Sequence, residues 1–153
     1  MRRLKPFFWA TDAGFLVYWL ITVLHAVPAR YLYPDYQNPL VVAWNWSFLP
    51  LDLCVSATGF TALYLHKRSV PTWRFVALLS LALTFCSGLQ AVGFWTMRCW
   101  FDWTWWLPNL YLLVYPLFFL PTLFREMYSA SQPLDQTSNQ TPAQPPAQGA
   151  VSL

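Results

Sequence analysis

The sequence predicts an all-α integral membrane protein, a four-helix up-down bundle with a disordered C-terminal tail. Of the 153 residues, 57% are hydrophobic and only 10% are charged, whereas soluble domains carry about 25% charged residues. Four apolar stretches each approach the roughly 20 residues that a helix needs to cross a bilayer. These stretches are continuous rather than alternating, which favours helices over a β-barrel.

The expected helices lie in a domain that spans residues 1–127. They cover about residues 7–27, 41–65, 72–97 and 104–124. The first stretch is longer than the 7–15 apolar residues typical of a signal peptide, so we expect it to be a retained helix. The connections between the helices are short, which makes sequential helices antiparallel neighbours.

Proline is expected to interrupt the second helix. Pro50 has no N–H, so the carbonyl of Trp46 loses its helical partner and a kink is predicted.

After the fourth helix, residues 128–153 are polar and rich in Pro and Gln. Such a segment buries too little apolar area to fold, so a disordered tail is predicted.

Basic residues predict the orientation, because cytoplasmic loops carry an excess of Lys and Arg. Seven of them fall on one side of the predicted spans: Arg2, Arg3, Lys5, Lys67, Arg68, Arg74 and Arg125. Arg30 and Arg98 fall on the other. Both termini are therefore predicted to be cytoplasmic, in a multi-pass protein of the cell inner (plasma) membrane.

Aromatic residues gather at the predicted outer ends of the spans. They are Tyr31, Tyr33, Tyr36, Trp44, Trp46, Trp95, Trp100, Trp103, Trp105 and Trp106. Trp and Tyr favour the headgroup level of a bilayer, so these rings predict an aromatic belt.

Composition also argues against several classes of function. The net charge is +3 without a cluster of Lys and Arg, which argues against a nucleic-acid partner. Cys54, Cys86 and Cys99 form no metal-binding pattern and are expected to be buried small hydrophobes. No metal, cofactor or catalytic motif is predicted, which favours a non-enzymatic protein. Acid–base chemistry by Asp52 with His25 or Asp12 stays open, because it needs no linear motif.

Two carboxyl groups stand within the apolar stretches. Carboxylates in hydrocarbon cost about 2.5–3.5 kcal/mol, so such residues are functional hypotheses. Asp52 lies roughly 16 Å below the outer end of the second helix, and Asp12 about 10 Å from the inner end of the first. Asp12 could instead cap a helix or pair with Arg3 or Lys5. Asp52 is either a hydrogen-bonded structural carboxyl or a ligand or proton site.

Further polar side chains share the outer half of the predicted bundle with Asp52. They are Asn45, Gln90, Asn109 and His25, so every helix contributes one. If they converge, they line an outward-opening pocket with Asp52. Each alone could instead be an interhelical hydrogen bond, worth about 0.6 kcal/mol.

The stretches NPLVVAWNWSFLPLDL (38–53), LTFCSGLQAVGFW (83–95) and WWLPNLYLLVYPLFF (105–119) resemble the YvaD-like family of small bacterial membrane proteins. The resemblance covers about residues 8–125. It implies a four-helix protein of the bacterial inner membrane. The family is a domain of unknown function, so no catalytic residue follows from it.

A fainter resemblance is to the EXPERA or emopamil-binding-like fold. It lies in the order of an LYP segment (32–34), a PLV helix start (39–41), Asp52 and PNLYLL (108–113). That resemblance implies binding of sterol-like amines, with Asp52 and Asp12 matching the acids of helices two and one. The chain lacks the further acidic residues of that family.

Three functions compete at this point. The first is a non-enzymatic protein that binds a small amphiphilic or lipid-like ligand around Asp52, Asn45, Gln90, Asn109 and His25. The second is a small proton-coupled transporter that acts as a homo-oligomer, with Asp12 as a second carboxylate site. The third is a structural or accessory subunit. All three take the lipid bilayer as a partner.

Overall fold

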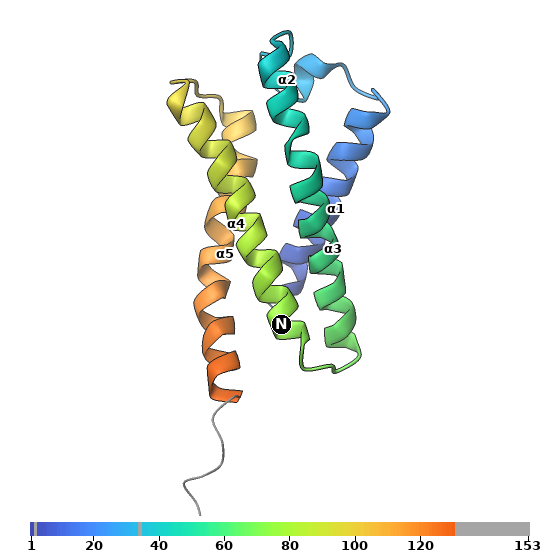
Figure 1. The fold of residues 1–153 in the computed structure, drawn as a ribbon, viewed down its shortest axis with the longest axis vertical. Helices are drawn as coiled ribbons and strands as arrows, with labels where there is room; N and C mark the ends of the chain where they lie inside the picture. The colour runs from blue at the N-terminus through green and yellow to red at the C-terminus, as the bar shows by residue number, and fades with distance from the viewer. Residues whose placement is uncertain (2, 34, 131–153) are drawn as a thin grey trace, which may run out of the picture.

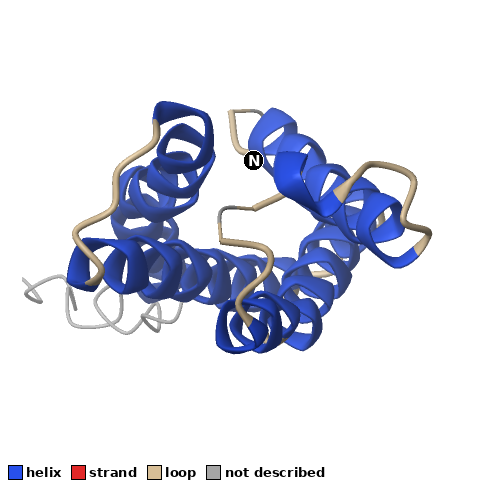
Figure 2. Ribbon diagram, turned by 90° about the horizontal axis from the view of Figure 1, so that it is seen from above, coloured by secondary structure: helices blue, strands red, loops and turns tan. Residues whose placement is uncertain are grey.

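The computed structural model describes residues 1, 3–33 and 35–130, so the predicted disorder falls almost entirely outside the described residues. Its elements are α1 (Lys5–Val23), a 3₁₀ turn η1 (Ala29–Tyr31), α2 (Pro39–Trp46), α3 (Phe48–Lys67), α4 (Trp73–Met97) and α5 (Trp103–Ala130). Figure 2 shows these helices joined by loops. The predicted all-α four-helix architecture is confirmed, with α2 and α3 forming one span.

Among the described residues, four helical stretches are long and apolar enough to cross a membrane. They are Lys5–Val23, Pro39–Lys67, Trp73–Met97 and Trp103–Ser129. The first ends at Val23, four residues before the predicted end. It stops there because His25 has a left-handed φ of 51°, and the N–H of Ala26 donates to the carbonyl of Ile21 at 3.0 Å. This pattern closes a helix and satisfies its last carbonyls.

The second span is broken close to Pro50, where a kink is predicted. α2 ends at Trp46 and α3 begins at Phe48. The hydroxyl of Ser47 donates to the carbonyl of Trp44 at 2.7 Å, so the break has its own hydrogen bond. Pro50 is the third residue of α3, where the N–H that it lacks would have bonded Trp46. In α5, by contrast, the helix continues through its three internal prolines.

The helices pack in the order α1, α3, α4, α5. Close pairs are α1 with α3, α3 with α4, and α4 with α5. In Figure 1, α4 and α5 run side by side, with α1 and α3 on the other side. The start of α1 and the end of α5 lie at the same end of the bundle.

Small residues give α4 its packing face. The sequence predicts close packing at Ser80, Thr84, Ser87, Gly88 and Ala91, and all five are buried. A Cβ at position 88 would lie 2.5 Å from the backbone nitrogen of Leu113 in α5. The backbones of α4 and α5 therefore approach as closely as glycine permits.

Aromatic residues at the loop-rich end of α2 form part of the core. Trp44 stacks on Phe94 with ring centroids 4.0 Å apart, and Trp95 is 1% exposed. Part of the predicted aromatic belt is therefore an interior cluster, whereas Tyr31 and Trp103 are exposed as expected.

The prediction that the cysteines are buried is wrong, because all three are exposed. Cys54 and Cys86 lie on helices, where a thiol adds little polarity to the exposed apolar surface.

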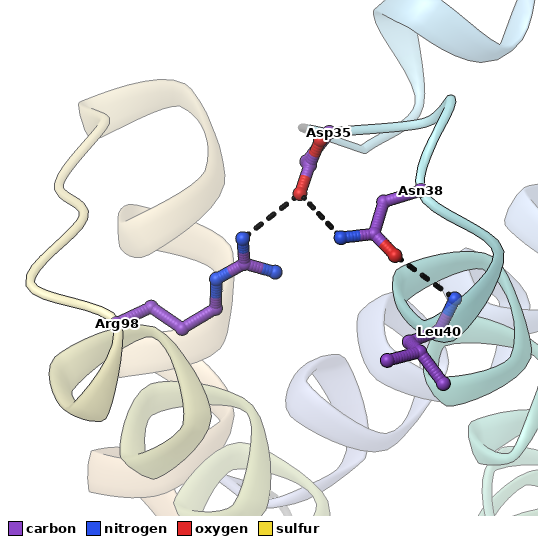
Figure 3. Close-up of polar contacts among 4 residues, drawn as sticks. All are labelled: Asp35, Asn38, Leu40 and Arg98. Carbon is purple, nitrogen blue, oxygen red and sulfur yellow. Dashed lines mark hydrogen bonds and ion pairs between the residues drawn. The ribbon is translucent and has the colours of Figure 1, made fainter.

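An ion pair joins the end of α4 to the loop before α2 (Figure 3). The guanidinium of Arg98 donates to Oδ2 of Asp35 at 2.9 Å, and Nδ2 of Asn38 donates to the same oxygen at 3.2 Å. Oδ1 of Asn38 in turn accepts from the N–H of Leu40 at 3.0 Å. The contact therefore holds the N-terminal cap of α2 in place.

Candidate functional site

Asp52 joins three helices through hydrogen bonds of its carboxyl group. It lies on α3 and is 4% exposed. Nε1 of Trp19 in α1 donates to Oδ2 at 2.9 Å, and the hydroxyl of Ser87 in α4 donates to Oδ1 at 3.0 Å. A carboxylate offers about four acceptor positions, so each oxygen keeps capacity for another donor. The carboxyl is therefore held in position, and its oxygens can still accept further hydrogen bonds.

A cavity of about 420 Å³ opens beside Asp52, between α1 and α5. This volume lies within the range of small-molecule sites, which runs from about 300 to 1,000 Å³. Its walls include Thr11, Gly14, Phe15, Tyr18 and Trp19 from α1, and Thr104, Trp105, Pro108, Asn109, Tyr111 and Leu112 from α5. Phe48 and Asp52 contribute from α3, and Ser87 and Ala91 from α4. All four spans thus supply lining residues.

Asn45 places an unused donor in the same wall. Its side chain is 5% exposed and lines the cavity. Oδ1 accepts from the hydroxyl of Tyr18 at 3.1 Å. Nδ2 is buried and has no hydrogen-bond partner among the described residues. A buried amide N–H without a partner costs free energy, so a ligand acceptor would relieve it.

The structure brings together three of the five residues predicted for the pocket. Asp52, Asn45 and Asn109 all line the cavity, although Nδ2 of Asn109 already donates to the carbonyl of Trp105 at 2.8 Å. Gln90 is exposed and lies outside the lining, because it directly precedes the buried Ala91 and is therefore rotated by about 100° away from it around α4. His25 is also exposed and lies beyond the end of α1, where its ring contacts the carbonyl of Val23. His25, which the sequence left open as a partner of Asp52, therefore does not contact it in this structure.

The other end of the cavity is closed by contacts between α1 and α5. The ring of Phe7 packs on Tyr115 and Phe119, with centroids 5.2 and 5.0 Å apart. The hydroxyl of Thr11 donates to that of Tyr115 at 3.2 Å. These contacts seal the end of the bundle that carries the N-terminus, so the cavity is confined to the half nearer the α2 end.

Asp12 forms a separate, sealed site. It is 0% exposed and faces Gly59 of α3, whose missing side chain makes room for the carboxyl. Neither carboxyl oxygen has a hydrogen-bond partner among the described residues. The hydroxyl of Ser56 donates to the backbone carbonyl of Asp12 at 3.2 Å, which leaves the carboxyl itself untouched. The alternatives of a cap or of pairing with Arg3 or Lys5 are therefore wrong.

Sequence reasoning missed the partners that position the site. Trp19 and Tyr18 carry polar atoms on large apolar rings, and such atoms usually find a partner when buried. That rule, applied to the first span, could have singled out both residues as donors to the acids and amides of the second.

Among the described residues, no group of His, Cys, Asp and Glu is arranged to hold a metal ion.

Fold and site together describe a small helical protein whose four apolar spans surround a mainly apolar cavity with a fixed carboxyl. The family of unknown function DUF5360 matches residues 4–130. The chain is also 48% identical over 126 residues to the uncharacterised protein YvaD of Bacillus subtilis (strain 168), an alignment that covers 82% of this chain and 95% of YvaD. The chain therefore belongs to this YvaD-like family of unknown function.

No solved structure matches the chain. The EXPERA resemblance stays a prediction.

Proposed function

We propose that this protein is embedded in the bacterial inner membrane and binds a small amphiphilic or lipid-like molecule in the cavity around Asp52. The observation that carries the proposal is a positioned carboxyl beside an amide Nδ2 that has no partner among the described residues, in a mainly apolar lining. Pockets of this kind fix a ligand through a few polar groups and bury the rest of it against apolar side chains.

The polar groups favour a particular ligand chemistry. The carboxyl of Asp52 accepts from an amine or hydroxyl, and Nδ2 of Asn45 donates to an acceptor on the same headgroup. The aromatic and aliphatic walls, which include Phe15, Trp105 and Leu112, suit a hydrocarbon tail. A headgroup that carries both an ammonium group and a hydroxyl or carbonyl oxygen, on an alkyl chain, meets these demands.

The distribution of basic residues supports an outward-facing cavity. Lys5 and Lys67 lie at the end of the bundle that Phe7 closes, and basic residues mark the cytoplasmic side of a membrane protein. The cavity occupies the other half, toward α2. A ligand dissolved in the outer leaflet would therefore reach Asp52 between α1 and α5.

Replacing Asp52 with asparagine is expected to weaken binding of dodecyldimethylamine about ten- to a hundredfold. Hydrogen bonds to charged groups contribute about 1.5–3 kcal/mol, which corresponds to that range. Binding of uncharged dodecanol is expected to change little, because the asparagine keeps the shape of the site. The change in tryptophan fluorescence during titration in zwitterionic nanodiscs measures both affinities, since Trp19 and Trp105 line the cavity.

Glu126→Gln is the matched control, because it removes an exposed carboxylate of α5 that pairs with Arg74 far from the cavity. It should leave both affinities unchanged. An equal loss for amine and alcohol in Asp52→Asn would mean that the carboxyl only holds α1 and α4 together. No loss for either probe would remove Asp52 from the binding site.

Asp12 favours proton-coupled transport as a second candidate function. A fully buried carboxyl without a partner is costly when ionised, so it would carry a proton that leaves only when the helices separate. In this reading, Asp12→Asn abolishes proton uptake by vesicles containing the protein under an imposed pH gradient. Unchanged uptake in Asp12→Asn, or uptake no greater than that of empty vesicles in the unmodified protein, would exclude it.

A further inference from the structure

A second cleft lies between the start of α1 and the end of α3, away from the Asp52 cavity. It encloses about 560 Å³. Lys5, His66 and Lys67 line it together with the aromatic residues Trp9, Phe60 and Tyr64. The cleft is thus basic on one side and aromatic on the other, which the Asp52 cavity is not.

Helical spacing places these residues in two rows, one along α1 and one along α3. On α1, Trp9 follows Lys5 by four residues and stands one turn deeper on the same face. On α3, Tyr64 and Phe60 precede Lys67 by three and seven residues, which again is the same face. Because both lysines line one cleft, the two helices present their charges at the end of the bundle and their rings toward its middle.

The charge of this cleft is unbalanced. No acidic residue is among its lining residues. Within the described part of the chain, the ion pairs are Arg74–Glu126 and Arg98–Asp35, so neither lysine is in one. Nδ1 of His66 is buried and has no hydrogen-bond partner among the described residues. An anion with several acceptor oxygens would compensate the two ammonium groups, and Nδ1 of His66 would join them in the tautomer in which it carries the proton.

The aromatic side chains of the cleft are exposed at the surface. Trp9 is 59% exposed and Tyr64 is 56% exposed. The ring of Trp9 meets that of Phe60 edge-on, with centroids 5.4 Å apart, so the two form one aromatic floor that bridges α1 and α3. A hydrocarbon chain could cover this floor directly beneath the basic groups.

We propose that this cleft binds an anionic phospholipid, with its phosphate between Lys5 and Lys67 and an acyl chain along Trp9 and Phe60. Phospholipids present charge and hydrocarbon in the same order as these two rows of residues. Basic clefts between helices at the end of a membrane span attract such headgroups. This site is independent of the ligand proposed for Asp52.

Native mass spectrometry of the full-length protein, titrated in detergent with dioleoyl phosphatidylglycerol, tests the proposal. Lys67→Gln and Lys5→Gln are each expected to weaken retention of this lipid about fivefold, because each lysine near the surface contributes about 1 kcal/mol. Lys67→Arg should retain binding, which shows that the charge matters and that the site still folds. Arg125→Gln removes one exposed charge of α5 away from the cleft and should have no effect.

Three results would overturn the assignment. The first is equal retention of dioleoyl phosphatidylcholine, because a neutral headgroup should not be selected. The second is a loss in Arg125→Gln as large as that in Lys67→Gln, which would mean general attraction rather than a site. The third is displacement of the lipid by inorganic phosphate at equal concentration, which would show a phosphate site that does not use the aromatic floor.

Discussion

Replacing Gly88 with alanine is expected to destabilise the bundle by about 1–3 kcal/mol, the usual cost of forcing extra volume into a packed core. The new Cβ would lie 2.5 Å from the backbone nitrogen of Leu113 and 2.9 Å from the carbonyl carbon of Leu112. These atoms belong to the main chain of α5, so they cannot rotate away as a side chain would. The two helices must separate instead.

The midpoint of thermal unfolding in detergent measures this effect. Gly93→Ala is the matched control, because it lies on the same helix and a Cβ there meets nothing within 4 Å. Alanine is the better helix former by about 1 kcal/mol, so the control should unfold at the same or a higher temperature. Equal midpoints for the two variants would contradict the close approach of α4 and α5.

Gly59→Ala is expected to be comparably destabilising, because a Cβ at position 59 would overlap the carboxyl of Asp12. The carboxyl ends a flexible side chain, but Asp12 is fully buried, so a change of rotamer must displace packed neighbours. We expect a loss of about 1–3 kcal/mol, measured by the same unfolding midpoint. Gly14→Ala serves as the control in α1, since nothing lies within 4 Å of its added Cβ.

Asp12→Ala should rescue Gly59→Ala. Removing the carboxyl opens the space that the new methyl group needs, so the two substitutions should couple by about 0.5–3 kcal/mol. Asp12→Ala alone removes a buried, unpartnered polar group and is expected to cost little. Additive effects of the two substitutions would show that Asp12 and Gly59 do not meet.

Periodicity and composition predicted the fold well because a bilayer leaves a chain few alternatives to helices. The four spans, the break before Pro50 and the small-residue face around Gly88 follow from local rules. The early end of α1 does not, because it depends on a left-handed φ at His25, a conformation that residue type predicts poorly.

The candidate site was only partly predictable. Asn45 and Asp52 are seven residues apart, which places them on one face of a continuous helix, and the break at Ser47 leaves both in the cavity lining. Gln90 does not line the cavity, because its position around the axis of α4 turns its side chain away from it. Its position along the helix is suitable. The hydrogen bonds from Trp19 and Ser87 to Asp52 join residues more than thirty positions apart. Which side chains meet across three helices is decided by packing.

Photolabelling tests the central claim, that a ligand reaches Asp52 between α1 and α5, most directly. The probe is a dodecyl amine with a diazirine on its terminal carbon, and peptide mass spectrometry maps its adducts after irradiation in nanodiscs. Adducts are predicted on cavity residues such as Phe15 and Leu112, and they should be lost in Asp52→Asn. Adducts confined to exposed residues such as Leu20 and Phe118, and unchanged in Asp52→Asn, would contradict the account.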